Sequence, residues 1–498
     1  MMNYELWIYD TDSGGENIDL TGNSSDHPFI IRRVQMPTPR KVREPILALD
    51  PEDCYEDREI RVVFDIIDAD CDPDPDTIYD ALSKINRLLR KAKEQDENEI
   101  IPTVEIRWKA NESTYTTYFV LLGGEVDNLI PSRDIGVARS LNLTLRTKPF
   151  GRGVGLGGAP IAVPLDNTSG SKTTDPVTVY NHDDITTGHD DWVNIEASDL
   201  KGDQPALCMF KAVNPASPNS LYQFRIADFA SDDISDFLFS YNAEGAGQVN
   251  GTLVDDVTAP GIGGGAGEGR RMDYTVDGKI RFNIPPSYSD VAFKRYFGNY
   301  MAILICCQRG GNQDDWRLRY ELTQTVAALT IIVGDWKNPK PNISGHWEAL
   351  ELGVFTIPPA PYIDPKQSLS FYVNCDELVD GTTMSIAALY LFPLKQWLLY
   401  RQTHDVNYGL SNLQYIKWDN ISLPPNVSIF YSTGYWRFHA GAEIGAIRSM
   451  VLDPTKNHHI GFLFGHWDVT HSFVDHDILD KLDVQCWYNP RYLHIRGS

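Results

Sequence analysis

Hydrophobic and polar residues alternate along the chain between Arg58 and Ile66, with Ile60, Val62 and Phe64 on one side of the alternation. A two-residue period is typical of a half-buried β-strand, because successive side chains of a strand point to opposite faces. The pattern then changes to the spacing of an amphipathic helix, whose apolar face comprises Ile78, Leu82, Ile85, Leu89 and Ala92. The chain is therefore predicted to pass from a strand into a helix.

Start signals for this helix precede its apolar face. Asp74 is suited to the N-cap, and Pro75 is suited to the first helical position, where the missing N–H costs nothing. Beyond the helix, alternation predicts strands over 104–109, around 118–122 and over 141–145. These elements predict that residues 1–150 form a β-sandwich with one flanking α-helix.

The beginning of the chain adds two short strands and an arm. The strands are predicted at Glu5–Tyr9 and Phe29–Gln35, and the arm is Met36–Pro45, with the sequence MPTPRKVREP. A segment so rich in proline and positive charge cannot hold a helix and tends to lie extended across another surface. A disordered loop is the alternative.

The rest of the chain is predicted to be mainly β. Residues 151–175 form a Gly/Pro-rich linker, and 176–498 is a sandwich or jelly-roll region, since short strands follow one another without crossover helices. Insertions are predicted near 243–269 and 401–445. Strands are predicted at Val177–Asn181, Trp192–Ile195, Ala206–Val213, Tyr222–Ile226, Lys279–Ile284, Tyr300–Cys307, Arg317–Leu322, Ala327–Val333, His346–Ile357, Ser368–Asn374, Thr383–Phe392, Ile460–Phe464 and Leu482–Tyr488.

Charge and cysteine usage narrow the function classes. The 498 residues include 44 Lys and Arg against 68 Asp and Glu, a formal net charge of −24, which argues against wrapping a nucleic-acid backbone. The seven cysteines form no CxxC pair, so we expect buried thiols and neither a disulfide framework nor a zinc site. No secretory signal is visible at the N-terminus, and no apolar run is long enough for membrane insertion.

Two motifs imitate ligand-binding loops. Asp68, Asp70, Asp72, Asp74 and Asp76 alternate as in a calcium loop, but Pro73 and Tyr79 stand where such a loop needs Gly and Glu. Negative charge at a helix N-terminus is explained by the helix dipole alone.

The second is Gly153, Gly155 and Gly158, which match the GxGxxG nucleotide fingerprint. Pro160 and Pro164 forbid the helix that this fingerprint requires, so we expect a linker and no bound cofactor.

Histidines and acids gather in two places where a metal ion is the minority interpretation. The first contains His182, Asp183, Asp184, His189, Asp190 and Asp191, and the second contains His458, His459, His466, His471 and His476 with Asp468, Asp475 and Asp477. A spacing of five places successive histidines on opposite faces of a strand, which is poor ligand geometry. We expect polar loops and no metal site.

The remaining chemistry is equally sparse. No GxSxG, Walker or HExxH motif occurs, so no catalytic residue is predicted. Paired carboxylates for glycoside hydrolysis are a three-dimensional property that these acids leave open. Aromatic residues able to stack on sugar rings lie in the β-rich part, although most are expected in the core: Trp316, Trp336, Trp347, Trp397, Trp436, Trp467 and Trp487.

The stretches EIRVVFDIIDAD, DTIYDALSKINRLLRKA, TVEIRWKANESTYTTYFVLLGGEV and SLNLTLRTKPFGRG carry a family resemblance. In the hydrophobic pattern of these stretches and in their order along the chain, residues 1–150 resemble the N-terminal belt domain of siphophage distal tail proteins, which is similar to the tail-tube fold. DWVNIEASDLKGDQPALCMF and LDVQCWYNPRYLHIRGS resemble pieces of phage tail proteins that have a galectin-like or jelly-roll C-terminal domain.

The resemblance implies a structural virion protein without catalysis, in a ring, commonly a hexamer, at the distal end of the tail tube. Its partners would be copies of itself, the tail-tube protein, the tail hub and the tail fibres. It would be made in the host cytoplasm and located in the virion. The arm Met36–Pro45 and the turn Asn111–Tyr115 are the predicted contacts to a neighbouring subunit.

Two rival functions remain at this point. One is a carbohydrate-binding β-sandwich module for attachment to host-surface glycans, and the other is a β-sandwich hydrolase that uses scattered acids.

Overall fold

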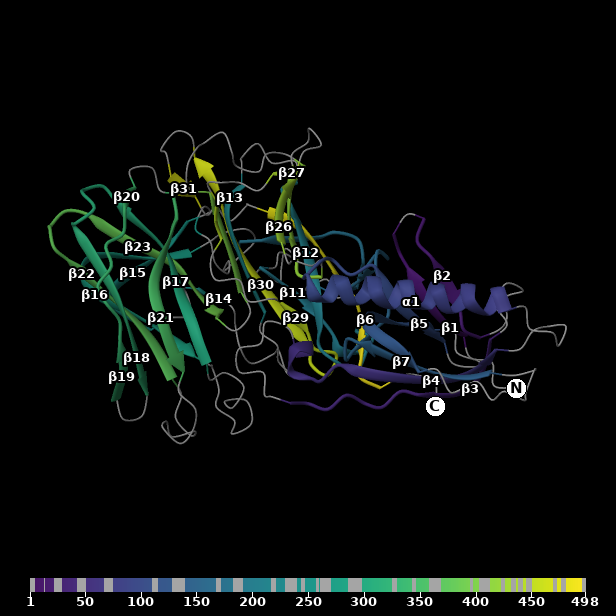
Figure 1. Ribbon diagram of the computed structural model, residues 1–498. Helices are drawn as coiled ribbons and strands as arrows, with labels where there is room; N and C mark the ends of the chain where they lie inside the picture. Colours follow the sequence, from purple (N-terminus) through teal and green to yellow (C-terminus); the bar gives the residue numbers. More distant parts are fainter. Residues whose placement is uncertain are drawn as a thin grey trace.

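A computed structural model describes residues 5–12, 14–21, 29–42, 51–66, 75–109, 115–127, 139–166, 172–181, 191–215, 221–228, 240–242, 247–256, 259, 270–284, 298–324, 329–342, 346–357, 369–394, 397–402, 413–421, 426–430, 436–437, 442–444, 450–468, 473–475 and 481–494. The described chain is mainly β, as predicted. Figure 1 shows its strands in three bodies, here called the N-terminal, middle and outer units.

The N-terminal unit contains the α-helix and one sheet, whose strands differ in length. Its strands are β1 (Glu5–Asp10), β2 (Asn17–Asp19), β3 (Phe29–Gln35), β4 (Arg58–Ile66), β5 (Val104–Lys109), β6 (Thr117–Asp127), β7 (Arg139–Thr147) and β8 (Gly151–Arg152), with a 3-10 turn η1 (Pro51–Cys54). The order is β2-β1-β5-β6-β7-β4-β3, and β8 pairs with β6 and with β33 (Arg491–Tyr492) from the far end of the chain. Every pair within this sheet is antiparallel.

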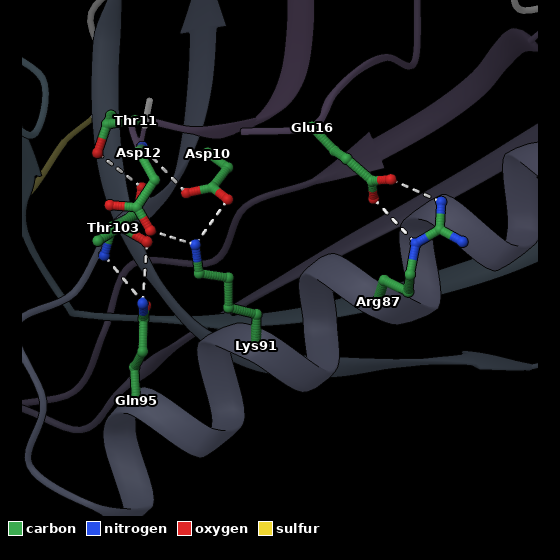
Figure 2. A network of polar contacts seen from close by, with 8 residues as sticks. All are labelled: Asp10, Thr11, Asp12, Glu16, Arg87, Lys91, Gln95 and Thr103. Atoms are coloured by element: carbon green, nitrogen blue, oxygen red, sulfur yellow. Dashed lines mark hydrogen bonds and ion pairs between the residues drawn. The ribbon is translucent and has the colours of Figure 1, made fainter. Parts of the chain in front are cut away.

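The helix α1 (Pro75–Glu97) begins at the predicted proline. Its apolar residues Ile85, Leu89 and Ala92 share one buried cluster with the inward side chains of the strands. Its polar side is fixed to the end of β1 and the segment that joins β1 and β2, as Figure 2 shows: Lys91 Nζ lies 2.7 Å from Asp10 Oδ2, and Arg87 Nη2 lies 2.6 Å from Glu16 Oε1. Apolar burial and ion pairs therefore position the helix together.

The middle unit is built from two sheets that enclose one core. The first contains β9 (Ile161–Ala162), β10 (Val177–Tyr180), β12 (Ala206–Val213), β25 (Tyr415–Asp419), β26 (Asn426–Phe430), β27 (Trp436–Arg437), β29 (Val451–Leu452) and β32 (Lys481–Tyr488). The second contains β11 (Trp192–Ile195), β13 (Leu221–Asp228), β24 (Trp397–Gln402), β28 (Ala442–Ile444), β30 (His458–Asp468) and β31 (Phe473–Asp475). The 3-10 turn η2 (Ala197–Asp199) follows β11.

The outer unit is formed by the chain between β13 and β24. Its strands are β14 (Ser240–Asn242), β15 (Gly247–Asp255), β16 (Arg270–Ile284), β17 (Gly298–Arg309), β18 (Trp316–Gln324), β19 (Leu329–Val333), β20 (Pro341–Asn342), β21 (Glu348–Ile357), β22 (Leu369–Glu377) and β23 (Thr383–Pro393). β16 pairs with β22 through residues 278–284 and with β23 through 272–274, so the single sheet divides into two leaves there. The Tyr320 hydroxyl of β18 donates to the Val354 carbonyl of β21, 2.9 Å away, and links the two leaves.

The outer and middle units share an apolar boundary. Leu463 of β30 and Ala227 of β13 join one buried cluster with Ile303 and Ile305 of β17 and with Tyr390 of β23. Neighbouring residues of the same strands, such as Phe462 and Leu304, face the cores of their own units. β17, β23 and β30 are therefore buried on both faces.

Most predicted strands are confirmed, and further strands lie in the segments predicted as a linker and as two insertions. Residues 243–269 contain β15, residues 401–445 contain β25 to β28, and residues 151–175 contain β8 and β9. These strands are short or carry exposed side chains, as β15 does, so their hydrophobic alternation is weak. The six described cysteines are buried free thiols, as predicted, while Cys71 lies outside the described residues.

Candidate assembly surface of the N-terminal unit

The described part of the Pro-rich arm, residues 36–42, lies on its own unit. Met36 packs against the N-terminal core. The Val42 N–H donates to the Cys54 carbonyl at 2.8 Å, and the Glu56 N–H donates to the Arg40 carbonyl at 2.9 Å. The prediction that the arm crosses another surface is confirmed for this part, but that surface belongs to the same unit. Residues 43–45 lie outside the described residues.

A groove runs between the arm and the middle of β6, with a volume of about 580 Å³. Its walls are residues 37–40 of the arm, 56–59 leading into β4, 122–125 of β6, Lys93 of α1 and Thr144 and Arg146 of β7. The floor depends on glycine: Gly123 has φ +138°, and a Cβ on Gly124 would lie 2.3 Å from the Thr144 carbonyl oxygen. The pairing of β6 with β7 shifts its register between Leu121 and Gly123 at this point.

Charges of both signs line the groove. The cations are Arg40, Arg58, Lys93 and Arg146, and the anions are Glu56, Asp57, Glu59 and Glu125. Arg146 lies 2.6 Å from Asp96 and 3.7 Å from Asp57, while burial raises the pKa of Asp57. A lining with balanced charge is suited to an extended polypeptide, whose backbone and side chains supply donors and acceptors in turn, more than to a polyanion.

Arg58 holds three segments together beneath this groove. Its side chain is buried, with 1% exposure, and donates to the carbonyls of Pro37 in the arm at 3.0 Å, Pro149 at 3.1 Å and Leu493 at 2.5 Å. Burial lowers the pKa of Arg58 to about 10. The guanidinium thus replaces its lost water with carbonyl oxygens from distant parts of the chain.

The C-terminal segment is attached here by two further contacts. β33 pairs with β8, and Arg491 lies 3.6 Å from buried Glu52, which also accepts from the Phe150 N–H at 3.2 Å. The segments around Glu52 and Arg58 and the last described residues therefore meet at one polar joint between the N-terminal and middle units.

The ends of the N-terminal sheet carry the other assembly feature. Among the described residues, β3 pairs with β4 alone and β2 with β1 alone. Unpaired strand edges are templates for another strand. Of the predicted contact turn 111–115 only Tyr115 is described, and its side chain is 57% exposed.

The second histidine cluster is described in part, and two of its buried histidines bond to neighbouring side chains. Among the described residues, no group of three or more His, Cys, Asp or Glu side chains could hold an ion. His458 Nδ1 lies 2.7 Å from Asp228 Oδ2, and His459 Nδ1 lies 2.7 Å from Asn194 Oδ1. Burial alone would lower the pKa of His458, but the Asp228 carboxylate outweighs it and raises that pKa, whereas burial lowers the pKa of His459 to about 3. His471, His476 and Asp477 lie outside the described residues.

Other predicted clusters are only partly described. Residues 68–74 and 182–190 lie outside the described residues, and Asp191 is buried. The Gly153–Gly158 segment enters no helix, and the Leu156 N–H donates to Glu105 Oε2 at 2.5 Å. Trp316 and Trp347 are buried as expected, while Trp336 and Trp487 are half-buried; nothing is described of the side chains of Trp397, Trp436 and Trp467. No helix among the described residues is long and apolar enough to cross a bilayer.

Comparisons with known proteins identify no family. No protein-family model and no curated protein matches the chain. Among solved structures, it is similar to the isomalto-dextranase of Arthrobacter globiformis T6 complexed with panose, at 10% identity and a TM-score of 0.20, over 47% of this chain and 39% of that one. It is also similar to a chain of Broad Bean Stain Virus, at 12% identity and a TM-score of 0.15, over 39% of this chain and 87% of that one. TM-scores this low do not indicate a shared fold.

Proposed function

We propose that this chain is a structural protein of a tailed-phage virion. Its N-terminal unit closes into a ring, commonly a hexamer, at the distal end of the tail tube, and the ring connects the tube to the tail tip, baseplate or fibres. The N-terminal unit is a tail-tube-like sandwich with a flanking helix, and the middle and outer units are galectin-like or jelly-roll sandwiches. The role is assembly and not catalysis.

One observation carries this proposal: among the described residues, an edge strand of the N-terminal sheet lies next to a groove of balanced charge. β3 pairs with β4 alone among the described residues, and the arm that directly follows β3 forms one wall of the groove. Cyclic closure repeats a single heterologous contact, so each subunit must present two different surfaces to its neighbours. The β3 edge and the groove are two such surfaces.

Static light scattering of the full chain over a range of concentrations tests the proposal. We expect the mass to rise toward a closed multiple of the subunit. In Arg40→Glu, an exposed groove position is reversed in charge, so association weakens. Arg90→Glu on α1, whose side chain is 81% exposed and is not among the residues that line the groove, leaves association unchanged. A chain that stays monomeric at the highest concentration contradicts the proposal.

A further inference from the structure

The outer unit has a polar sheet face opposite its core. Leu318, Tyr320 and Leu322 of β18 belong to the core, so Arg317, Arg319 and Glu321 point the other way. The same alternation applies to β22 and the second half of β16. We call this surface the polar face; its residues are Arg317, Arg319 and Glu321 of β18, Tyr372, Asn374 and Asp376 of β22, and Lys279 and Arg281 of β16.

Strand register sets these side chains side by side in rows. Arg319 lies opposite Asn374, which lies opposite Lys279, and Val249 of β15 continues that row. The next row contains Tyr372, flanked by Glu321 and Arg281. The charged residues lie on three strands that are far apart in the sequence, and pairing of these strands in the sheet brings them onto one surface.

Trp336 covers one side of this face. The guanidinium carbons of Arg317 and Arg319 lie 4.6 and 4.5 Å from its ring centroid. Because both arginines project from β18, the half-buried indole lies over the strand and is held there by cation–π attraction. Lys279 Nζ lies 4.1 Å from the Tyr372 ring in the same way.

The face is positive on an acidic protein. It carries four cations, Arg317, Arg319, Lys279 and Arg281, against two anions, Glu321 and Asp376, while the whole chain has a formal charge of −24. Arg317 is paired with Asp376 at 2.5 Å and Lys279 with Glu321 at 2.8 Å. The Arg281 guanidinium has no carboxylate partner among the described residues.

We infer that the polar face binds an acidic oligosaccharide. Arginine recognises a carboxylate with two parallel hydrogen bonds, which the unpaired Arg281 can supply. Sugar hydroxyls both donate and accept, and the carboxylates of Glu321 and Asp376 on this face can accept from them. Trp336 and Tyr372 give apolar ring surface for the carbon-bound hydrogens of a sugar.

A nucleic acid fits this surface less well. A long polyanion would meet the chain's overall negative charge beyond the face, which weakens phosphate-driven binding. The two carboxylates would also repel phosphates inside the face. The inference is independent of ring formation, because the outer unit shares no described element with the N-terminal sheet.

Calorimetric titration of the full chain with tetragalacturonate, a uronic-acid tetrasaccharide, tests the inference, with neutral cellotetraose as the matched ligand. We expect binding of the acidic sugar and at least about tenfold weaker binding of the neutral one, since charged hydrogen bonds are lost. The variant Val249→Glu adds a negative charge at a 57% exposed position beside Lys279 and should reduce the affinity for tetragalacturonate. Its neutral counterpart Val249→Gln should retain it.

Arg281→Gln should also weaken binding about tenfold, while Arg61→Gln on the N-terminal unit should not, with the melting temperature of each variant confirming the fold. Absence of tetragalacturonate binding overturns the inference. Equal affinity for cellotetraose and tetragalacturonate also overturns the inference. A third contradicting outcome is that an oligothymidylate binds more tightly than tetragalacturonate and that Val249→Glu weakens this binding as well.

Discussion

The outer unit meets the middle unit through closely packed apolar side chains, whereas the N-terminal unit meets it through buried charged ones. In the first boundary, Ile303, Ile305 and Trp347 lie in one buried apolar cluster with Leu463. In the second, Arg58 donates to the carbonyls of Pro37, Pro149 and Leu493, and Glu52 forms an ion pair with Arg491. Substitutions should therefore destabilise the apolar boundary and the charged joint for different reasons.

An apolar boundary loses stability in proportion to the volume removed, because a cavity remains. A buried charged joint depends on complete partnering: when one member is removed, the others are left desolvated and unpaired. It fixes orientation more than it adds stability. Such a joint suits a unit that must be held at a defined angle, as the ring proposed above would require.

The largest expected effect is at the apolar boundary. Trp347→Ala should lower the free energy of unfolding by about 3–5 kcal/mol, because a fully buried indole is replaced by a cavity. Urea denaturation measures it. Val354→Ala, at a 50% exposed position on neighbouring β21, is the control and should change stability little. A small effect of Trp347→Ala would show that the boundary is not closely packed.

The charged joint should respond next. Arg58→Met keeps the apolar stem but leaves the carbonyls of Pro37, Pro149 and Leu493 without their donor, at a cost of about 2–3 kcal/mol. Limited proteolysis should also release the C-terminal segment more readily. Arg61→Met on the same strand, with a side chain 61% exposed, should be nearly neutral. If the two variants behave alike, the joint does not depend on Arg58.

The helix contact in Figure 2 should show a smaller loss. Lys91→Met removes the cation from Asp10, whose side chain is only 7% exposed, and should cost about 1–2 kcal/mol. Lys93→Met breaks an exposed pair with Glu97 at 3.6 Å and should cost less than about 0.5 kcal/mol. Thermal unfolding compares them, and equal losses would contradict the role assigned to Asp10.

The smallest effect concerns pH and the buried pair in the middle unit. Asp228 raises the pKa of His458 above its ordinary value of 6.5, so the folded chain binds this proton more tightly than the unfolded chain. That stabilisation is complete below about pH 6.5 and is lost as the pH rises through the raised pKa. The urea midpoint should therefore fall over this window in the native chain and less in His458→Gln. Exposed His494→Gln is the control, and identical slopes in all three would exclude the effect.

Local pattern was enough for most of the elements. The two-residue alternation in β4 and β32 and the helical face from Leu82 to Ala92 depend only on neighbours in sequence, and the structure has strands and a helix at these places. Weakly patterned strands were missed. β15 has mostly exposed side chains on both faces, and β8 and β9 are two residues long. None of the three has enough alternation of hydrophobic and polar residues to be recognised as a strand.

Composition and short-range periodicity were enough to predict a mainly β chain, a helix that begins at Pro75 and the buried free thiols of the six described cysteines. Contacts between residues far apart in the sequence, in contrast, follow from the folded chain alone. Arg58 and Leu493 are joined across 435 positions, and Arg281, Tyr372 and Glu321 form one row through strand register. Such contacts depend on how sheets close and strands align, and no local pattern encodes that choice.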